Sequence, residues 1–240
     1  MTRPLLEVCV ADAESLAAAV AGGADRIELC SALELGGLTP APGLMRLAAK
    51  APIPVYAMVR PRSGDFVFTA DEMEIMLADI DAIRGFGLKG VVVGASRPDG
   101  TLDADLLRRL RDRAQGLGAT LHRAFDIVPD FAAALETAIE LGFERILTSG
   151  GAATATDGIA QLRSLNSAAR GRISIMPGSG LTPQNVQHLL QAVPATEVHS
   201  SCSAARTTAN ERAVGLHLAQ ASHRRTDKEM VAEFKRALGD

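Results

Sequence analysis

The sequence predicts an α/β protein built as a single-domain (β/α)8 barrel, the TIM barrel, over residues 1–240. Short β-like runs alternate with amphipathic, Ala- and Leu-rich segments, which is the pattern of a parallel sheet with crossover helices. Eight such runs occur, and the unit repeats roughly every 25–35 residues, as expected for a closed barrel. A chain of 240 residues also suits one α/β barrel, which typically takes roughly 200–250 residues.

The eight predicted strands are short and mostly apolar. They lie at 5–10 (LLEVCV), 26–31 (RIELCS), 55–60 (VYAMVR), 90–94 (GVVVG), 120–125 (TLHRAF), 145–150 (RILTSG), 173–178 (ISIMPG) and 197–201 (EVHSS). An open doubly wound sheet uses the same units and is the alternative fold. We disfavour it because no G-x-G-x-x-G motif opens the first helix, and because eight units exceed what most open sheets of this length hold.

The segments between the strands carry signals for the start and end of helices. In the first, DAESLAAAVAGG, Asp12 is the expected N-cap, and Gly22 and Gly23 are expected to end the helix. The segments 71–87 and 103–118 begin with carboxylates and end at glycine, as helices commonly do. The segments 130–143 and 156–171 repeat this pattern.

Composition and charge exclude several classes of protein. The chain is 47% apolar, with 22 glycines and a formal net charge of −3, as expected of a globular protein with a sizeable core. No run approaches ~18 uncharged apolar residues and no targeting signal is visible, so we expect a cytoplasmic protein without a membrane partner. Three cysteines without tight spacing are expected to be reduced thiols. Aromatic residues make up only 3% and charges are mixed, so we expect no nucleic-acid partner.

Polar residues gather where the predicted strands end, which is the end of a barrel that carries chemistry. Within one strand, side chains two residues apart face the same way. The pairs spaced in this way are Glu7 and Cys9, Glu28 and Cys30, His122 and Asp126, and Glu197 and His199. Because Val8, Leu29 and Val198 lie between members of these pairs and suit a surface covered by helices, we expect the polar members to face the barrel interior. Buried carboxylates need partners, and Arg60 on the third strand is the expected one.

Two chemistries compete for such a site, and the first is metal binding. Cys9 and Cys30 lie 30 − 9 = 21 residues apart, one strand–helix unit, so we expect corresponding positions on adjacent strands. Two thiolates suit a soft cation such as Cu(I), whereas Ca²⁺ or Mg²⁺ would prefer the carboxylates. Cys202 is a candidate third sulfur. The fuller, closely spaced ligand set of a zinc site is not visible.

The second chemistry is the binding of a small anionic ligand. The run RPRSGDF offers Arg60 and Arg62, and the loop PGSGLTPQN after the seventh strand offers backbone N–H groups, a place where barrels commonly hold phosphate. The residues expected to bind the anion are Arg60, Arg62, Gly178, Ser179, Gly180 and Ser200. If the protein is an enzyme, Glu28, His122 and Asp126 are the acid–base candidates.

Several of these motifs together match a known family. The opening block EVCVADAESLAAAVAGGADRIELCSALELGGLTP is followed in order by RPRSGDF, HRAFD, LTSGG, the PGSGL loop and EVHSS. In these motifs, from about residue 5 to residue 201, the chain resembles the CutC family of copper homeostasis proteins. The resemblance implies a TIM barrel, a cytoplasmic location, a homodimer or higher homo-oligomer, and a link to copper tolerance.

The resemblance also implies particular site residues. The Cu(I)-binding cysteines proposed for the family correspond to Cys9 and Cys30, and Cys202 has no counterpart. The family's polar pocket residues correspond to Glu7, Glu28, Arg60, His122, Asp126 and His199. We therefore expect Cu(I) bound by Cys9 and Cys30, or alternatively an enzyme acting on a small phosphorylated or carboxylated metabolite. A binding or scaffold role of the oligomer is a third possibility.

Overall fold

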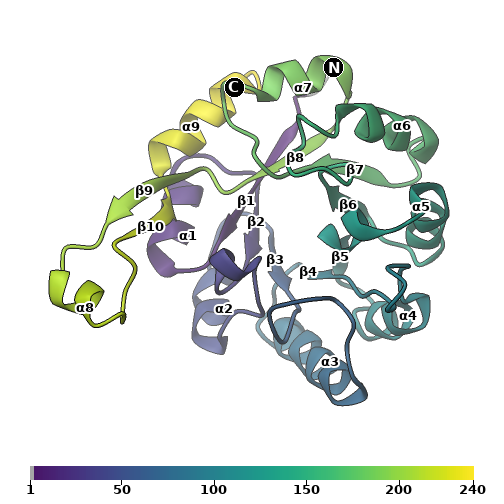
Figure 1. The fold of residues 1–240 in the computed structure, drawn as a ribbon, viewed down its shortest axis with the longest axis horizontal. Helices are drawn as coiled ribbons and strands as arrows, with labels where there is room; N and C mark the ends of the chain where they lie inside the picture. The colour runs from purple at the N-terminus through teal and green to yellow at the C-terminus, as the bar shows by residue number, and fades with distance from the viewer. Residues whose placement is uncertain (1–2) are drawn as a thin grey trace.

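The computed structural model describes residues 3–240 and shows eight parallel strands around a central axis (Figure 1). The strands are β1 (Leu5–Val10), β2 (Arg26–Leu29), β3 (Val55–Met58), β4 (Gly90–Val93), β5 (Gly118–Leu121), β6 (Arg145–Thr148), β7 (Ser174–Pro177) and β8 (Glu197–Ser200). Hydrogen-bonded neighbours follow the order β7-β6-β5-β4-β3-β2-β1-β8, and β7 also packs beside β8. The two ends of the sheet therefore meet, which confirms the predicted (β/α)8 barrel.

Helices surround the strands (Figure 1). They are α1 (Ala13–Ala21), α2 (Pro42–Ala48), α3 (Ala70–Gly85), α4 (Ala104–Arg113), α5 (Phe131–Glu140), α6 (Ile159–Ala169), α7 (Val186–Ala192), α8 (Glu211–Gly215) and α9 (Lys228–Ala237). The predicted cap of the first helix is confirmed, because the Asp12 carboxylate accepts the Ser15 N–H at 2.8 Å and Gly22 is the C-cap. None of the helices within residues 3–240 is both long and apolar enough to cross a membrane.

The fifth strand ends earlier than the sequence predicts. It stops at Leu121, and the Nδ1 atom of His122 accepts the Ala124 N–H at 3.1 Å, which starts a 3-10 helix, η2 (Arg123–Ile127). Strand parity therefore does not apply beyond Leu121, and the prediction that His122 and Asp126 face the same way along one strand is wrong.

A two-stranded arm follows β8 and was not expected from the sequence. It consists of β9 (Ser203–Thr207) and β10 (Ser222–Thr226), with α8 between them, and it projects from the barrel in Figure 1. These strands are rich in Arg, Ser and Thr and are largely exposed, so they lack the apolar run that identifies a strand in the barrel.

The barrel strands separate an apolar outer layer from a polar interior. Val8, Ile27 and Leu29 are fully buried between the sheet and the helices. At alternate positions on the same strands, Glu7 and Arg26 are buried inside the barrel. Because side chains alternate along a strand, successive residues of the same strand face the apolar core and the polar interior in turn.

A glycine on β4 makes room for the one tyrosine of the chain. Gly90 lies opposite Tyr56 in the ladder, and a Cβ at Gly90 would overlap the Tyr56 ring. That ring cannot easily move, because its hydroxyl donates to Glu144 at 2.9 Å and Arg145 stacks 4.9 Å from its centroid.

We therefore expect Gly90→Ala to lower the free energy of unfolding by about 1–3 kcal/mol through overpacking. Urea denaturation monitored by circular dichroism measures this change in the free energy of unfolding. Gly85→Ala in α3 is the matched control, because nothing lies within 4 Å of its added Cβ, and it should stabilise the helix by up to about 1 kcal/mol. Equal effects of the two substitutions would contradict the packing described here.

Candidate functional site at the barrel mouth

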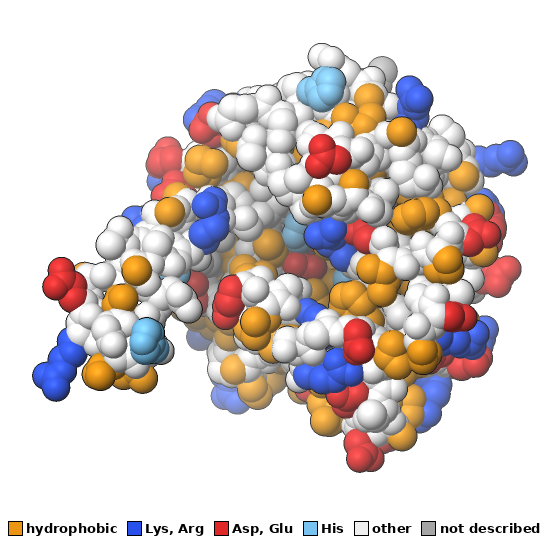
Figure 2. Space-filling view, viewed as in Figure 1, with side chains coloured by type: hydrophobic (Ala, Val, Ile, Leu, Met, Phe, Trp, Pro, Cys, Tyr) orange, Lys and Arg blue, Asp and Glu red, His pale blue; other side chains and the backbone are white. Residues whose placement is uncertain are grey.

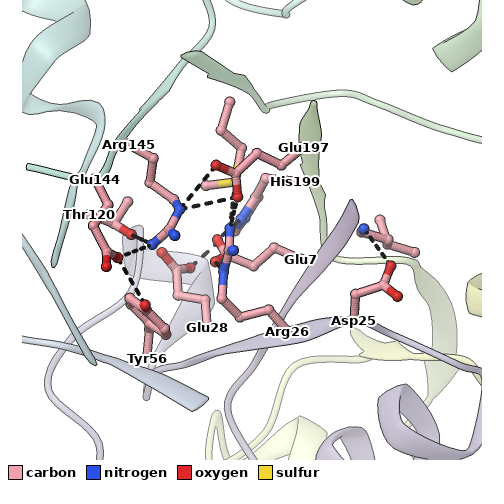
Figure 3. Close-up of polar contacts among 12 residues, drawn as sticks. Glu7, Asp25, Arg26, Glu28, Tyr56, Thr120, Glu144, Arg145, Glu197 and His199 are labelled. Atoms are coloured by element: carbon pink, nitrogen blue, oxygen red, sulfur yellow. Dashed lines mark hydrogen bonds and ion pairs between the residues drawn. The ribbon is translucent and has the colours of Figure 1, made fainter. Parts of the chain in front are cut away.

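The floor of the site is a buried layer of alternating charges (Figure 3). Arg26 at the start of β2 binds both Glu7 of β1 and Glu197 of β8, the latter at 2.5 Å. Arg145 at the start of β6 binds Glu197 at 3.1 Å and Glu144 at 3.0 Å. All of these groups except Glu144 are buried, so the pairs neutralise charges that water cannot reach.

The charge layer holds its acids ionised. Burial alone would raise the pKa of Glu7, but the Arg26 charge and the His199 hydrogen bond outweigh it and lower that pKa to about 2. The pKa of Glu197 is likewise lowered, since the charges of Arg26 and Arg145 outweigh burial.

The expected partner of these acids, Arg60, is not one of them. Its guanidinium donates to the carbonyls of Leu35 at 2.9 Å, Gly37 at 3.2 Å and Gly64 at 2.6 Å, which ties the loops after β2 and β3 together. Parity would have identified the true partner Arg26, because it lies two residues before Glu28 and so faces the same side. Arg145, Tyr56 and Thr120 are further interior polar residues that the sequence reasoning missed.

Above this floor, three potential ligands converge from three strands. They are Cys9 of β1, Glu28 of β2 and His199 of β8, and a sulfur, a carboxylate oxygen and a ring nitrogen of these residues all lie within 4.8 Å of one another. All three side chains are buried. The predicted inward orientation of Glu7, Glu28, Glu197 and His199 agrees with the structure (Figure 3).

His199 is held in a defined orientation. Its Nδ1 atom lies 2.8 Å from Glu7, an ionised acceptor, so Nδ1 carries a proton, and Nε2 faces Glu28 at 3.8 Å. Burial alone would lower the pKa of His199, but its interactions with Cys9 and Glu28 raise that pKa well above its usual value. Burial raises the pKa of Glu28.

The second predicted cysteine lies farther along the barrel axis. The β1–β2 ladder pairs Cys9 with Glu28, so Cys30 is one inward position beyond that level. The expectation of corresponding positions is wrong because neighbouring barrel strands are staggered, which makes the register offset here 28 − 9 = 19 residues rather than 21. The Cys30 sulfur lies 3.6 Å from Glu28, and burial raises the pKa of its thiol. All three cysteines are free and buried.

The cluster opens into a cavity of about 460 Å³ at the carboxyl ends of the strands. Figure 2 shows this mouth as a hollow that contains basic, acidic and histidine side chains. Of the predicted site residues, the cavity wall includes Cys9, Glu28, Arg60, His122, Ser179, Gly180, His199 and Ser200. The hydroxyl of Ser200 donates to the Leu181 carbonyl at 2.9 Å, so it joins the loops after β7 and β8.

Besides Glu7, Cys30 and Glu197, three more of the predicted residues lie outside that wall. Arg62 binds Glu72 at the start of α3 and the Val67 carbonyl. Asp126 accepts hydrogen bonds from Thr148, Ser149 and Gly151, so its carboxylate holds the loop after β6 in place. Gly178 makes room for its neighbours, because a Cβ there would lie 3.2 Å from the Cβ of His199.

A second histidine, His122, lies in the wall away from the charge layer. Burial and the nearby Arg60 charge lower its pKa to about 3, so it is neutral at pH 7. In the unfolded chain a histidine has a pKa of about 6.5. Between these two values only the unfolded chain binds the proton, so stability falls as the pH drops from about 6.5 towards 3.

We expect His122 to cost the folded state about 2 kcal/mol at pH 5 relative to pH 7. Urea denaturation at both pH values measures this, and His122→Gln should remove that part of the difference. Exposed His188 provides the control, since His188→Gln should keep the pH dependence of the parent. The same pH dependence in His122→Gln and the parent would contradict the buried neutral ring.

Comparison with known proteins places the fold and these residues in a family. A sequence model of the CutC family matches residues 4–204. The chain is 58% identical to the family protein CutC of Sinorhizobium medicae (strain WSM419), over 99% of this chain and 97% of that relative. It is 46% identical to the human copper homeostasis protein cutC homolog, over 84% of this chain and 74% of the human protein.

A solved structure agrees with these sequence matches. The putative copper homeostasis protein CutC of Streptococcus agalactiae superposes with a TM-score of 0.79 at 30% identity, covering 82% of this chain and 98% of that one. The eight-stranded barrel, the order of the motifs along the chain and these matches lead to one conclusion: this chain belongs to the CutC family.

Proposed function

We propose that the protein is a cytosolic copper homeostasis protein that binds Cu(I) at the barrel mouth, with Cys9 and His199 as ligands. The observation that carries the proposal is the convergence of a thiol, an imidazole and a carboxylate within 4.8 Å. The name of the human relative, a copper homeostasis protein, supports copper as the ion.

The donor set fits a soft ion. Thiolate and imidazole are donors that suit copper, whereas Ca²⁺ and Mg²⁺ require several oxygen ligands. A structural zinc site usually has four ligands, and the cluster within residues 3–240 offers three. Bonds from zinc to nitrogen and sulfur are about 2.0–2.3 Å long, so donors on opposite sides of such an ion lie about 4.3 Å apart, which is slightly less than the 4.8 Å that bounds this cluster.

The surroundings of His199 support the choice of ligands. Histidines that bind metals usually donate the other ring N–H to a carboxylate, which fixes the ring and its tautomer. Glu7 accepts such a bond from Nδ1 of His199, and Arg26 holds Glu7 from its other side. The Nε2 atom is therefore the one presented to an ion.

Cys9 is a better candidate than Cys30 for the sulfur ligand. Cys9 lies in the cavity wall and belongs to the three-residue cluster, whereas Cys30 is fully buried and lies outside both. We therefore propose Cys9 and His199 as the ligand pair in place of the Cys9 and Cys30 pair predicted from the sequence. A variant of Cys30 distinguishes the two ligand pairs.

The test is a competition for Cu(I) between the reduced protein and a chromophoric Cu(I) chelator under anaerobic conditions. We expect the protein to withdraw one equivalent of Cu(I) from the chelator. Zn²⁺ at the same concentration should not change the number of equivalents withdrawn. Failure to withdraw copper would disprove the proposed function.

A further inference from the structure

The cavity wall contains buried polar atoms that no protein group satisfies. Within residues 3–240, five buried side-chain nitrogen or oxygen atoms lack a hydrogen-bond partner, and three of them belong to residues that line this cavity. These three are Nε of Arg60, Nε2 of His122 and Oε1 of Glu28. Because an unsatisfied buried polar group costs about 1–3 kcal/mol, the two donors among these atoms, on Arg60 and His122, indicate a ligand that accepts hydrogen bonds.

Arg60 carries an uncompensated charge. Only 4% of the residue is exposed, and all of its protein acceptors are backbone carbonyls. No carboxylate within residues 3–240 forms an ion pair with it, unlike Arg26 and Arg145 in the layer below. A buried guanidinium without a counter-charge is costly unless a bound anion supplies one.

His122 offers a second donor beside Arg60. Its Nδ1 atom accepts the Ala124 N–H, and the ring is neutral with a pKa of about 3, so the proton is on Nε2. One aromatic ring packs against both residues, because the Phe66 centroid lies 4.9 Å from the His122 ring and 4.9 Å from the Arg60 guanidinium. Phe66 lines the cavity together with these two residues.

The rest of the wall suits a small organic anion. Arg60, Arg123 and Arg224 lie in the wall, against one acid, Glu28. Leu33, Met58 and Leu147 supply apolar surface. A cavity of about 460 Å³ is within the size range of pockets for small metabolites and is larger than a single metal ion requires.

We propose that the barrel mouth also binds a small organic oxyanion, with a carboxylate or phosphate oxygen accepting hydrogen bonds from Nε of Arg60 and Nε2 of His122. The apolar part of this ligand packs against Met58 and Leu33. The oxyanion donors come from the ends of β3 and β5, whereas the proposed copper ligands lie on β1 and β8. The two proposals are therefore independent.

The test uses the metal-free, reduced full chain and four probes: propionate, ethyl phosphate, inorganic phosphate and neutral propionamide. Nitrogen-15 NMR of the histidine rings follows Nε2 of His122, and calorimetry gives affinities up to tens of millimolar. We expect an anionic probe to shift the His122 resonance and propionamide to leave it unchanged. Propionate binding alone would identify a carboxylate ligand, and binding of ethyl phosphate, with or without inorganic phosphate, would identify a phosphate ligand.

Matched variants connect the binding to the two donors. Arg60→Gln should lower the affinity for the anionic probe about 10- to 100-fold, which corresponds to the loss of a charge-assisted hydrogen bond. Arg62→Gln is the control, because Arg62 lies in the same loop but outside the cavity wall, and it should bind like the parent. If Arg60→Gln does not fold, as judged by circular dichroism, His122→Asn serves as the second variant and should also weaken binding.

Three results would overturn the inference. One is the absence of any shift with all anionic probes, and the second is equal binding of propionamide and propionate. The third is unchanged affinity in folded Arg60→Gln and His122→Asn. None of these measurements involves copper, so they leave the copper proposal unaffected.

Discussion

Replacing Arg26 by methionine should lower the free energy of unfolding by about 3–5 kcal/mol, the largest stability effect that we expect in this protein. Arg26 bridges Glu7 and Glu197, and all three side chains are nearly or completely excluded from water. Methionine keeps much of the volume but leaves two buried carboxylates short of a counter-charge. Urea denaturation at pH 7, with circular dichroism and intrinsic tyrosine fluorescence, measures the change.

An exposed arginine provides the control for this prediction. Arg113 also binds a carboxylate, Asp81, but about half of each side chain is exposed. Exposed ion pairs contribute at most about 1 kcal/mol, so Arg113→Met should change stability by less than that. Adding Glu197→Gln to Arg26→Met should recover part of the loss, because one of the stranded charges is then removed. Similar losses in Arg26→Met and Arg113→Met would show that the interior layer is not a charge network.

Removing either proposed copper ligand should produce the largest functional effect. Changing a group that only orients a metal ligand typically costs about 10- to 100-fold in metal affinity. The loss of a ligand itself should therefore cost at least about 100-fold, so Cys9→Ser and His199→Gln should each fail to compete with the chelator. Glu7→Gln, which alters the group that orients His199, should fall in the 10- to 100-fold range.

The other two cysteines distinguish the proposed site from a site made of two thiolates. Cys30 lies outside the three-residue cluster, and Cys202 follows β8. We expect Cys30→Ser and Cys202→Ser to bind Cu(I) nearly as tightly as the parent. If Cys30→Ser abolishes binding while His199→Gln does not, the ion is held by Cys9 and Cys30, as the sequence first indicated.

Local periodicity is sufficient to predict most of this fold. Eight short strands, the cap at Asp12 and the repeat of strand and helix are all local patterns, and the structure contains them. Strand parity also predicts which residues face inward on β1, β2 and β8, because a period of two does not depend on neighbouring strands.

The errors have two physical causes, and the first is that sequence spacing does not give the alignment between strands. The stagger of the barrel places Cys9 beside Glu28, and no pattern within a single strand reveals it. Parity places Arg26 on the inward face of β2 with Glu28, but only the alignment between strands shows that it lies opposite Glu7 in the ladder. The second cause is the early end of β5 at Leu121, beyond which strand parity no longer predicts where Asp126 lies.

X-ray absorption spectroscopy at the copper edge of the Cu(I)-loaded protein tests the central proposal most directly. If Cys9 and His199 hold the ion, the first shell contains one sulfur and one imidazole nitrogen, and the imidazole signal disappears in His199→Gln. A shell of two sulfurs without imidazole, or one of nitrogen and oxygen alone, would contradict this site.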